Sequence, residues 1–367
     1  MVNKTNIFFI ALPDKYHSQS IFSVAHTSSD TIFNYFWLTF RKQKMNNARD
    51  GKIDFFKGCL MLSVIFGHTI NSLFHQTGIH IGLHTLLRTF DMPMFMLISG
   101  FLLRTSLSKH GAWRTIANRT SGIVVPTIIF MALAFAIGHN NTFYFLWAVF
   151  GCTAIVAIIS NILKNKYLQI TALVLVVLLF HLTDSRCMNM AYLMPFFVIG
   201  FYLNSLEISA KQGLIGIAAF VVAFVFWRTD YTFWNYGANL LHNTLETSLV
   251  VCFRLIIGIL GIIAGGFCMS LIYQKFAGKK ITATITGFGK ETLAIYLMQY
   301  FIVEIGLKQL ASANNCLIRN AVAQHPMLAG YIAAPLLAFV ITLIIYLIAV
   351  LIKKYKATRW IFGFKIL

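Results

Sequence analysis

Apolar runs of about twenty residues recur along nearly the whole chain, separated by short polar segments. Each run is continuous rather than alternating, and each is about long enough to cross a bilayer as a helix. We therefore expect an all-α, polytopic membrane protein with about ten transmembrane helices. The expected spans lie near residues 53–74, 83–103, 119–137, 143–163, 167–182, 190–206, 213–227, 248–272, 290–307 and 327–352.

Composition supports this pattern and excludes a sizeable soluble domain. The 367 residues are 58% hydrophobic and only 11% charged, whereas a soluble domain has about 25% charged residues. The mean hydropathy is +0.74. There is no evident internal repeat, which weakens the case for a transporter built from inverted halves.

The formal net charge of +19 is distributed unevenly between alternate loops. From Met45 onwards most lysines and arginines fall on one side of the expected spans. The positive-inside bias then places both chain ends in the cytoplasm of a protein of the cell (inner) membrane. This bias explains most of the charge, so a nucleic-acid partner is not expected, whereas a polyanionic ligand at the cytoplasmic face is. The few cations on the outer side are Arg186, Arg228, Lys308 and Arg319.

Residues 1–44 do not follow this plan, because their apolar runs are short and interrupted by charges. Met45 is followed by a polar lead-in, "NNARDGK", to the first span. We expect translation to start at Met45, with residues 45–367 forming the transmembrane domain. The alternative is an interfacial segment, which the aromatic stretch "FNYFWLTF" allows.

The six cysteines are scattered and show no metal-ligand spacing, so no metal site is expected. Cys187 and Cys316 both fall in expected outer loops and could form a disulfide in an oxidising compartment. The alternative is that both are unpaired packing residues.

Five ionisable residues inside the expected spans are costly in lipid and favour a polar site. At ~1.5 Å per helical residue, they lie roughly 3 to 8 Å beyond the midplane on the outer side. Any one of them could be a packed or structural residue, but together they form one layer. They are His68, Arg88, Asp91, Arg254 and Glu304.

A second set of charges lies near the cytoplasmic surface. Lys57 and Asp54 stand three residues apart at the start of the first span, and Arg114 and Arg119 precede the third. Each cation could also be a topology signal that only obeys the positive-inside bias.

Several segments in order resemble acyltransferase family 3, the multipass membrane O-acyltransferases. The first span has a basic residue, ten intervening residues and a histidine, matched by Lys57 and His68. Later segments, "FFVIGFYL", "FRLIIG" and "GKETLAIYLMQ", resemble inner spans of the family. A Met-Pro-x-Phe run ending in Ser-Gly-Phe is matched by Met92, Pro93, Phe95, Ser99, Gly100 and Phe101.

The resemblance implies transfer of an acyl group, usually acetyl from acetyl-CoA, to a hydroxyl of a glycan or related acceptor. His68 would be the general base, since imidazole titrates near working pH. Asp91 could hold the His68 tautomer, and Arg254 or Arg88 could stabilise the developing oxyanion. Glu304 would belong to the same catalytic layer.

The donor side follows from the same resemblance. Lys57, Arg114 and Arg119 would bind the phosphates of acyl-CoA from the cytoplasm. Two positions depart from the family pattern: Asp91 stands where many members have a histidine, and only Arg119 matches an Arg-x-Arg pair.

Two other classes of function remain open. A secondary transporter also places charges at mid-membrane, and a non-catalytic membrane protein could assemble with polysaccharide synthesis or export machinery. The acceptor, a surface glycan, a lipid-linked sugar or a small metabolite, is not specified by these residues.

We expect deletion of residues 2–44 to leave membrane insertion and acyl transfer intact, because no later motif depends on them. Membrane abundance and activity of a chain started at Met45 test this. A degraded or inactive product would show that the extension has a structural role.

Overall fold

The computed structural model describes residues 51–74, 81–182, 190–228, 231, 245–312, 317–355 and 359–362. Within these residues the regular structure is helical and there is no strand. The expectations for residues 1–44, for Met45 as the start, and for pairing of Cys187 with Cys316 lie outside this part of the chain. The expected all-α class is therefore confirmed for the described residues.

The helices follow the expected apolar runs closely. The first half contains α2 (Gly51–Leu73), α3 (Gly82–Arg88), α4 (Asp91–Arg119), the π-helical η1 (Thr120–Val124), α5 (Val125–Ala136), α6 (Tyr144–Ile162), α7 (Lys166–Leu182) and α8 (Met190–Tyr202). The second half contains α9 (Ala210–Val225), α10 (Leu245–Lys275), α11 (Lys280–Lys290), α12 (Thr292–Gln299), π-helical η3 (Tyr300–Leu307), α13 (Lys308–Ser312), α14 (Leu317–Gln324), α15 (Pro326–Leu328), π-helical η4 (Ala329–Ala333), α16 (Ala334–Lys354) and the 3₁₀ turn η5 (Arg359–Phe362).

Six of the described helical stretches are long and apolar enough to cross a membrane, which makes the chain a multipass membrane protein. Three shorter apolar helices, α7, α8 and α9, also coincide with expected spans. Length and composition thus support six spans, and the count of about ten stays a prediction. The six are Gly51–Leu73, Gly82–Ala136, Tyr144–Ile162, Leu249–Lys275, Thr292–Ser312 and Pro326–Lys354.

The 55-residue stretch Gly82–Ala136 contains two of the expected spans in one helical run. The helical path breaks at Gly111, whose φ of 71° is in the left-handed region that favours glycine. This break lies in the polar segment "LSKHGAW", between the two apolar runs. The two predicted spans are therefore separated at Gly111.

The outward faces of several helices carry large apolar side chains. Phe135 of α5 is 79% exposed, Val225 of α9 is 77% exposed and Leu336 of α16 is 63% exposed. A soluble monomer rarely exposes so much contiguous apolar surface, whereas lipid solvates it. These faces are the natural bilayer contacts of the fold.

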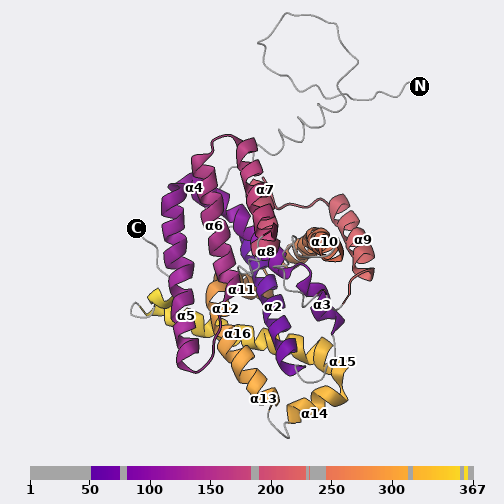
Figure 1. Ribbon diagram of the computed structural model, residues 1–367. Coiled ribbons are helices and arrows are strands. Elements are labelled where there is room, and N and C mark those ends of the chain that lie inside the picture. The colour runs from indigo at the N-terminus through magenta and orange to yellow at the C-terminus, as the bar shows by residue number, and fades with distance from the viewer. Residues whose placement is uncertain are drawn as a thin grey trace, which may run out of the picture. The chain divides into compact units, whose positions relative to one another are not determined.

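Helix α2 is the central element of the described bundle. In α2, 67% of the most apolar window is buried, against 28–50% in the other five spans. It contacts α4 and α10 as well as the C-terminal helices α11, α12 and α16, which surround it in Figure 1. Side chains on α2 can therefore meet residues from both halves of the chain.

Two glycine contacts set the closest helix crossings. A Cβ on Gly100 would lie 2.0 Å from the Phe197 carbonyl oxygen, and one on Gly200 would lie 2.0 Å from that of Leu97. Helices α4 and α8 thus cross backbone to backbone, as small residues allow in membranes. Gly58 and Gly289 join α2 to α11 in the same way, since a Cβ on Gly289 would lie 1.6 Å from the Asp54 carbonyl oxygen.

The three π-helical segments differ in their local cause. Pro126 stands four residues after Gly122 of η1. Likewise, Pro335 stands four residues after Tyr331 of η4. A proline ring clashes with the carbonyl four residues earlier, which explains the widened turns there. Segment η3 contains no proline, and π-turns without such a cause are frequent at functional sites.

We expect Gly200→Ala to destabilise the protein because its methyl group overlaps the Leu97 carbonyl. Overpacking of this kind costs about 1–3 kcal/mol. Gly122→Ala is the matched control, since its Cβ would meet nothing within 4 Å. Thermal unfolding of the purified variants should show a lower midpoint for Gly200→Ala alone; equal midpoints would contradict the crossing.

Candidate active site

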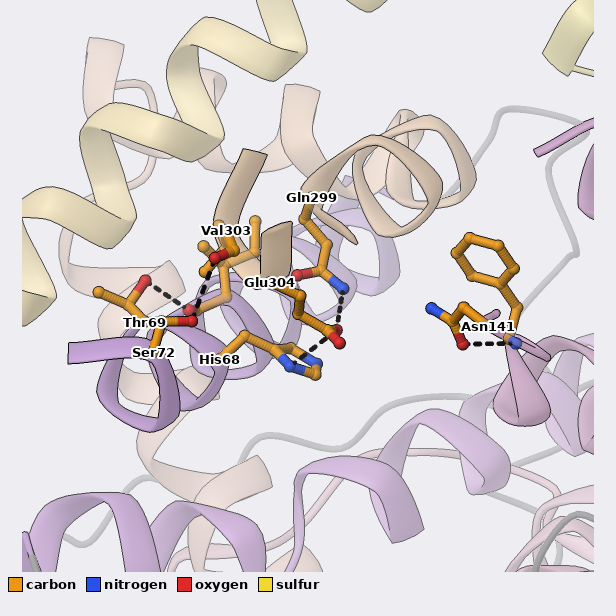
Figure 2. Close-up of polar contacts among 9 residues, drawn as sticks. His68, Thr69, Ser72, Asn141, Gln299, Val303 and Glu304 are labelled. Carbon is orange, nitrogen blue, oxygen red and sulfur yellow. Dashed lines mark hydrogen bonds and ion pairs between the residues drawn. The ribbon is translucent and has the colours of Figure 1, made fainter. Parts of the chain in front are cut away.

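His68 and Glu304 form a close polar contact between α2 and η3. His68 Nδ1 lies 3.1 Å from Glu304 Oε1, and Figure 2 shows the imidazole of α2 facing the carboxylate of η3. The side chains are 19% and 33% exposed, so a substrate can reach them. One turn further along α2, the Ser72 hydroxyl donates to the Val303 carbonyl at 3.1 Å, which fixes η3 against the same face of α2.

The π-helical turn explains how Glu304 is oriented. Gln299 donates from Nε2 to Glu304 Oε1 at 3.3 Å, although the two residues are five apart. In an α-helix, positions five apart point about 140° away from each other. The i→i+5 register of η3 instead places them together, and Gln299 is 2% exposed. The widened turn therefore directs Glu304 toward both Gln299 and His68.

A break between α3 and α4 places opposite charges at facing helix ends. Arg88 ends α3 and Asp91 begins α4, with only Thr89 and Phe90 between them. Both charges complement the helix dipoles. Asp91 is fully buried; it accepts the Met92 N–H at 2.6 Å and faces the Ser63 hydroxyl of α2 at 3.5 Å.

The carboxylate that holds His68 is thus Glu304 and not Asp91, contrary to the sequence-based expectation. No ion pair joins Asp91 to His68 among the described residues. The expectation relied on equal depth in neighbouring spans, but depth does not determine which way a side chain points around its helix. Asp91 is occupied by the first turn of its own helix and by Ser63.

Arg88 is the cation at the centre of this group. It interacts electrostatically with His68, Asp91 and Glu304. Its Cδ lies 3.8 Å from the position of a Cβ on Gly67, the α2 residue beside His68. Arg88 is thus the arginine whose charge acts on His68, and a cation near an imidazole can stabilise negative charge that develops there.

Two tyrosines that the sequence analysis did not single out join the same group. Tyr144 interacts electrostatically with Arg88, Asp91 and Glu304, and Tyr296 interacts with Tyr144 and Glu304. Both carry a hydroxyl into the polar centre, where each is a potential hydrogen-bond donor.

Phe143, just before α6, has a strained backbone beside these tyrosines. Its φ of 45° is a left-handed value that bulky residues rarely adopt. Its ring packs at 5.4 Å from that of Tyr300 and 6.4 Å from that of Tyr296, and its N–H donates to Asn141 Oδ1 at 3.0 Å. Backbone strain of this kind concentrates at functional sites, and here it positions Tyr144.

Arg254 occupies the edge of the group. It is 2% exposed, and its guanidinium lies 5.2 Å from the Tyr192 ring centroid and 5.7 Å from that of Trp227. It also has a side-chain hydrogen bond with Tyr192 and interacts electrostatically with Arg88. Of the two arginines expected to stabilise an oxyanion, Arg88 is the one that interacts with His68.

A pocket of about 360 Å³ opens beside Glu304. It is lined by residues of η3, α13 and the loop after α5, namely His139, Tyr300, Glu304, Ile305, Lys308, Gln309 and Ser312. Glu304 therefore lines a cavity on the Lys308 side, and His68 lies behind Glu304 at the distance given above.

The cations expected at the donor face occupy different environments. Lys57 Nζ lies 2.8 Å from Oδ1 of the buried Asp54, as their spacing suggested. Arg114 is exposed, and Arg119 is partly buried at the end of α4.

The described part of the chain contains no cluster of metal-ligating side chains. No group of three His, Cys, Asp or Glu side chains there is arranged to hold an ion. Cys59, Cys152, Cys252 and Cys268 are unpaired thiols.

Comparison with known proteins identifies the family of the chain. A family model described as an acyltransferase domain matches residues 50–354. The chain belongs to this acyltransferase family. The match includes both glycine crossings and all five ionisable residues of the central group, so the resemblance stated from the motifs is confirmed.

Two relatives share the name "Nodulation protein NolL". The one from Mesorhizobium japonicum is 24% identical over 292 residues, covering 69% of this chain and 76% of its own length. The one from Sinorhizobium fredii is 25% identical over 239 residues, covering 56% of this chain and 64% of its own length. No solved structure matches the chain.

We expect Lys57→Ala to destabilise the protein because it removes the ion pair of a buried carboxylate. Breaking a buried pair costs about 3–5 kcal/mol. The double variant Asp54→Asn/Lys57→Met, which removes both charges, should regain most of the lost stability. Thermal unfolding of the three proteins tests this; equal midpoints for Lys57→Ala and wild type would show that the pair is not structural.

Proposed function

We propose that the protein transfers an acyl group, acetyl foremost, from cytoplasmic acyl-CoA to a hydroxyl of a cell-surface glycan or lipid-linked sugar. The observation that carries this proposal is the His68–Glu304 contact within a membrane acyltransferase fold. An ionisable pair is costly at this depth and marks a functional site.

The contact assigns the two imidazole nitrogens different roles. Since Glu304 Oε1 lies beside Nδ1, the proton resides on Nδ1 and Nε2 is left as the base. Nε2 accepts the proton of the acceptor hydroxyl while that oxygen attacks the thioester carbonyl carbon. The carbon–sulfur bond then breaks, and the imidazolium returns the proton to the coenzyme A thiolate.

Arg88 is the residue best placed to stabilise negative charge on the carbonyl oxygen. It interacts with the imidazole of His68, whereas Arg254 is stacked between Tyr192 and Trp227. Asp91 holds Arg88 electrostatically from the facing helix end. Glu304 adds a second negative charge near Arg88, and Arg254 adds a second positive charge at the edge of the group. In this scheme His68 and Arg88 contact reacting atoms, and Asp91, Arg254 and Glu304 are positioning residues.

The donor approaches from the Lys57 end of α2. Lys57 and His68 are eleven residues apart, roughly 16 Å along a helix, which suits an extended thiol arm reaching inward. The exposed Arg114 and the partly buried Arg119 are the remaining candidates for the phosphates, since Lys57 is already paired with Asp54. This topology has about ten spans, with both chain ends in the cytoplasm of the inner membrane.

A transporter remains the second candidate, because a partly exposed ionisable pair beside a pocket also suits proton-coupled transport. The two functions differ in what happens to the acyl-CoA thioester. An acyltransferase cleaves acyl-CoA only as an acceptor is modified, whereas a transporter moves solute across sealed vesicles and leaves the thioester intact. A partner of polysaccharide synthesis machinery without catalysis would do neither.

We expect His68→Ala to lower acyl transfer at least about 100-fold, the usual scale of general-base catalysis. Glu304→Gln should lower turnover roughly 10- to 100-fold, because it keeps the shape but removes the charge that stabilises the imidazolium. Mass spectrometry of surface glycans, normalised to membrane-inserted protein, gives the measurement.

Two exposed residues outside the site provide matched controls. His110→Ala and Glu207→Gln make the same chemical changes at exposed positions and should retain wild-type transfer. Near-normal transfer by His68→Ala would refute the assignment of the base, and loss of transfer in the controls would show that the assay reports folding.

A further inference from the structure

The pocket beside Glu304 has a composition suited to a hydroxyl-rich ligand. Six of its seven lining residues carry a polar side chain, and only Ile305 does not. Apolar atoms still form the larger part of the lining surface, as they do in most ligand sites. The polar groups would therefore orient a ligand that has both hydrogen-bonding groups and an apolar face, as a sugar ring has. The volume of about 360 Å³ is at the small end of ligand sites, about 300 to 1,000 Å³.

The pocket lies on the side of His68 that is away from Lys57. Helices α2 and α12–η3 run in parallel, because Asp54 packs against Gly289 at one end and Ser72 bonds Val303 near the other. Lys308 follows η3 directly, so it lies beyond the reactive pair along this direction. A donor entering past Lys57 and a ligand in this pocket would meet His68 from opposite sides.

Lys308 gives the pocket its charge preference. Its side chain is exposed, and no ion pair holds it among the described residues. It interacts electrostatically with Glu304, the carboxylate that lines the same pocket, but the two side chains form no ion pair in the described part of the chain. The ammonium group is therefore available for an anion brought by the ligand, and a charge-assisted contact of this type is strong.

We propose that this pocket is the acceptor subsite and that it takes an anionic sugar. The sugar ring lies between Tyr300 and the polar side chains of Gln309, Ser312 and His139, and Lys308 binds its carboxylate or phosphate. The hydroxyl to be acylated then points toward His68. This inference rests on the proposed function, because the bound sugar is an acceptor only if the protein transfers an acyl group. Binding of the sugar does not itself require catalysis.

Binding of three simple sugars to the full-length protein in lipid nanodiscs tests the subsite, with no acyl-CoA present. Methyl β-D-glucuronide carries a carboxylate, glucose 1-phosphate carries a phosphate, and methyl β-D-glucoside is neutral. Saturation-transfer difference NMR titrations provide the affinities. At least one anionic sugar should bind about tenfold or more tightly than the neutral one, and the tighter of the two identifies the anion.

The variants assign the effect to Lys308. Lys308→Met should abolish the preference for the anionic sugar, and Lys308→Arg should keep it within about threefold. Lys211→Met, at an exposed position of α9, is the control and should bind as wild type does. Equal affinity for all three sugars, absence of binding, or a preference that persists in Lys308→Met would each overturn the proposal.

The binding experiment, combined with the transfer assay described above, separates this proposal from the enzymatic one. If anionic sugars bind through Lys308 but no acyl group is transferred to any acceptor, the subsite stands and the proposed transferase activity fails. If transfer occurs but the sugars bind without a Lys308-dependent preference, the activity stands and the anionic subsite fails.

Discussion

The contact between His68 Nδ1 and Glu304 Oε1 is the interaction on which the rest of the structure depends. An ionisable pair in a membrane bundle is retained only where surrounding groups hold it. Here α2 supplies the imidazole from the most buried span, and the Ser72–Val303 hydrogen bond fixes η3 on the same face. At the other end of α2, the Gly58–Gly289 crossing brings α11 against it and so sets the start of α12. The widened turn of η3 then directs Glu304 toward His68.

The broken helix α3–α4 completes the centre from the other side. Its break permits a cation and an anion, Arg88 and Asp91, to lie at facing helix ends that favour their charges. Tyr144, placed by the strained Phe143, closes the group. The result is a polar centre with a pocket on its Lys308 side. In the proposed function the donor approaches this centre from the Lys57 end of α2, so that a group can pass from one side to the other.

Much of this organisation was predictable because charge in an apolar run is costly. The layer of His68, Arg88, Asp91, Arg254 and Glu304 follows from that cost, as does the Asp54–Lys57 pair from its i, i+3 spacing. The partner of His68 was not predictable, because the wider turn of the π-helix η3 rotates every following side chain. No proline in η3 indicates that wider turn in the sequence. Tyr144 and Tyr296 gave no signal, since tyrosines near span ends usually mark the membrane interface. Gln299 did give a signal in the sequence, because it is an uncharged polar residue inside an apolar run.

The central claim is that Glu304 holds His68 with the proton on Nδ1 and with Nε2 free to act as the base. Nitrogen-15 NMR of histidine-labelled protein in nanodiscs measures this directly, with the His68 signal assigned by its loss in His68→Gln. The account predicts a protonated Nδ1 and an unprotonated Nε2 in the wild type, and loss of that preference in Glu304→Gln. A His68 protonated on Nε2, with the same spectrum in both proteins, would contradict it.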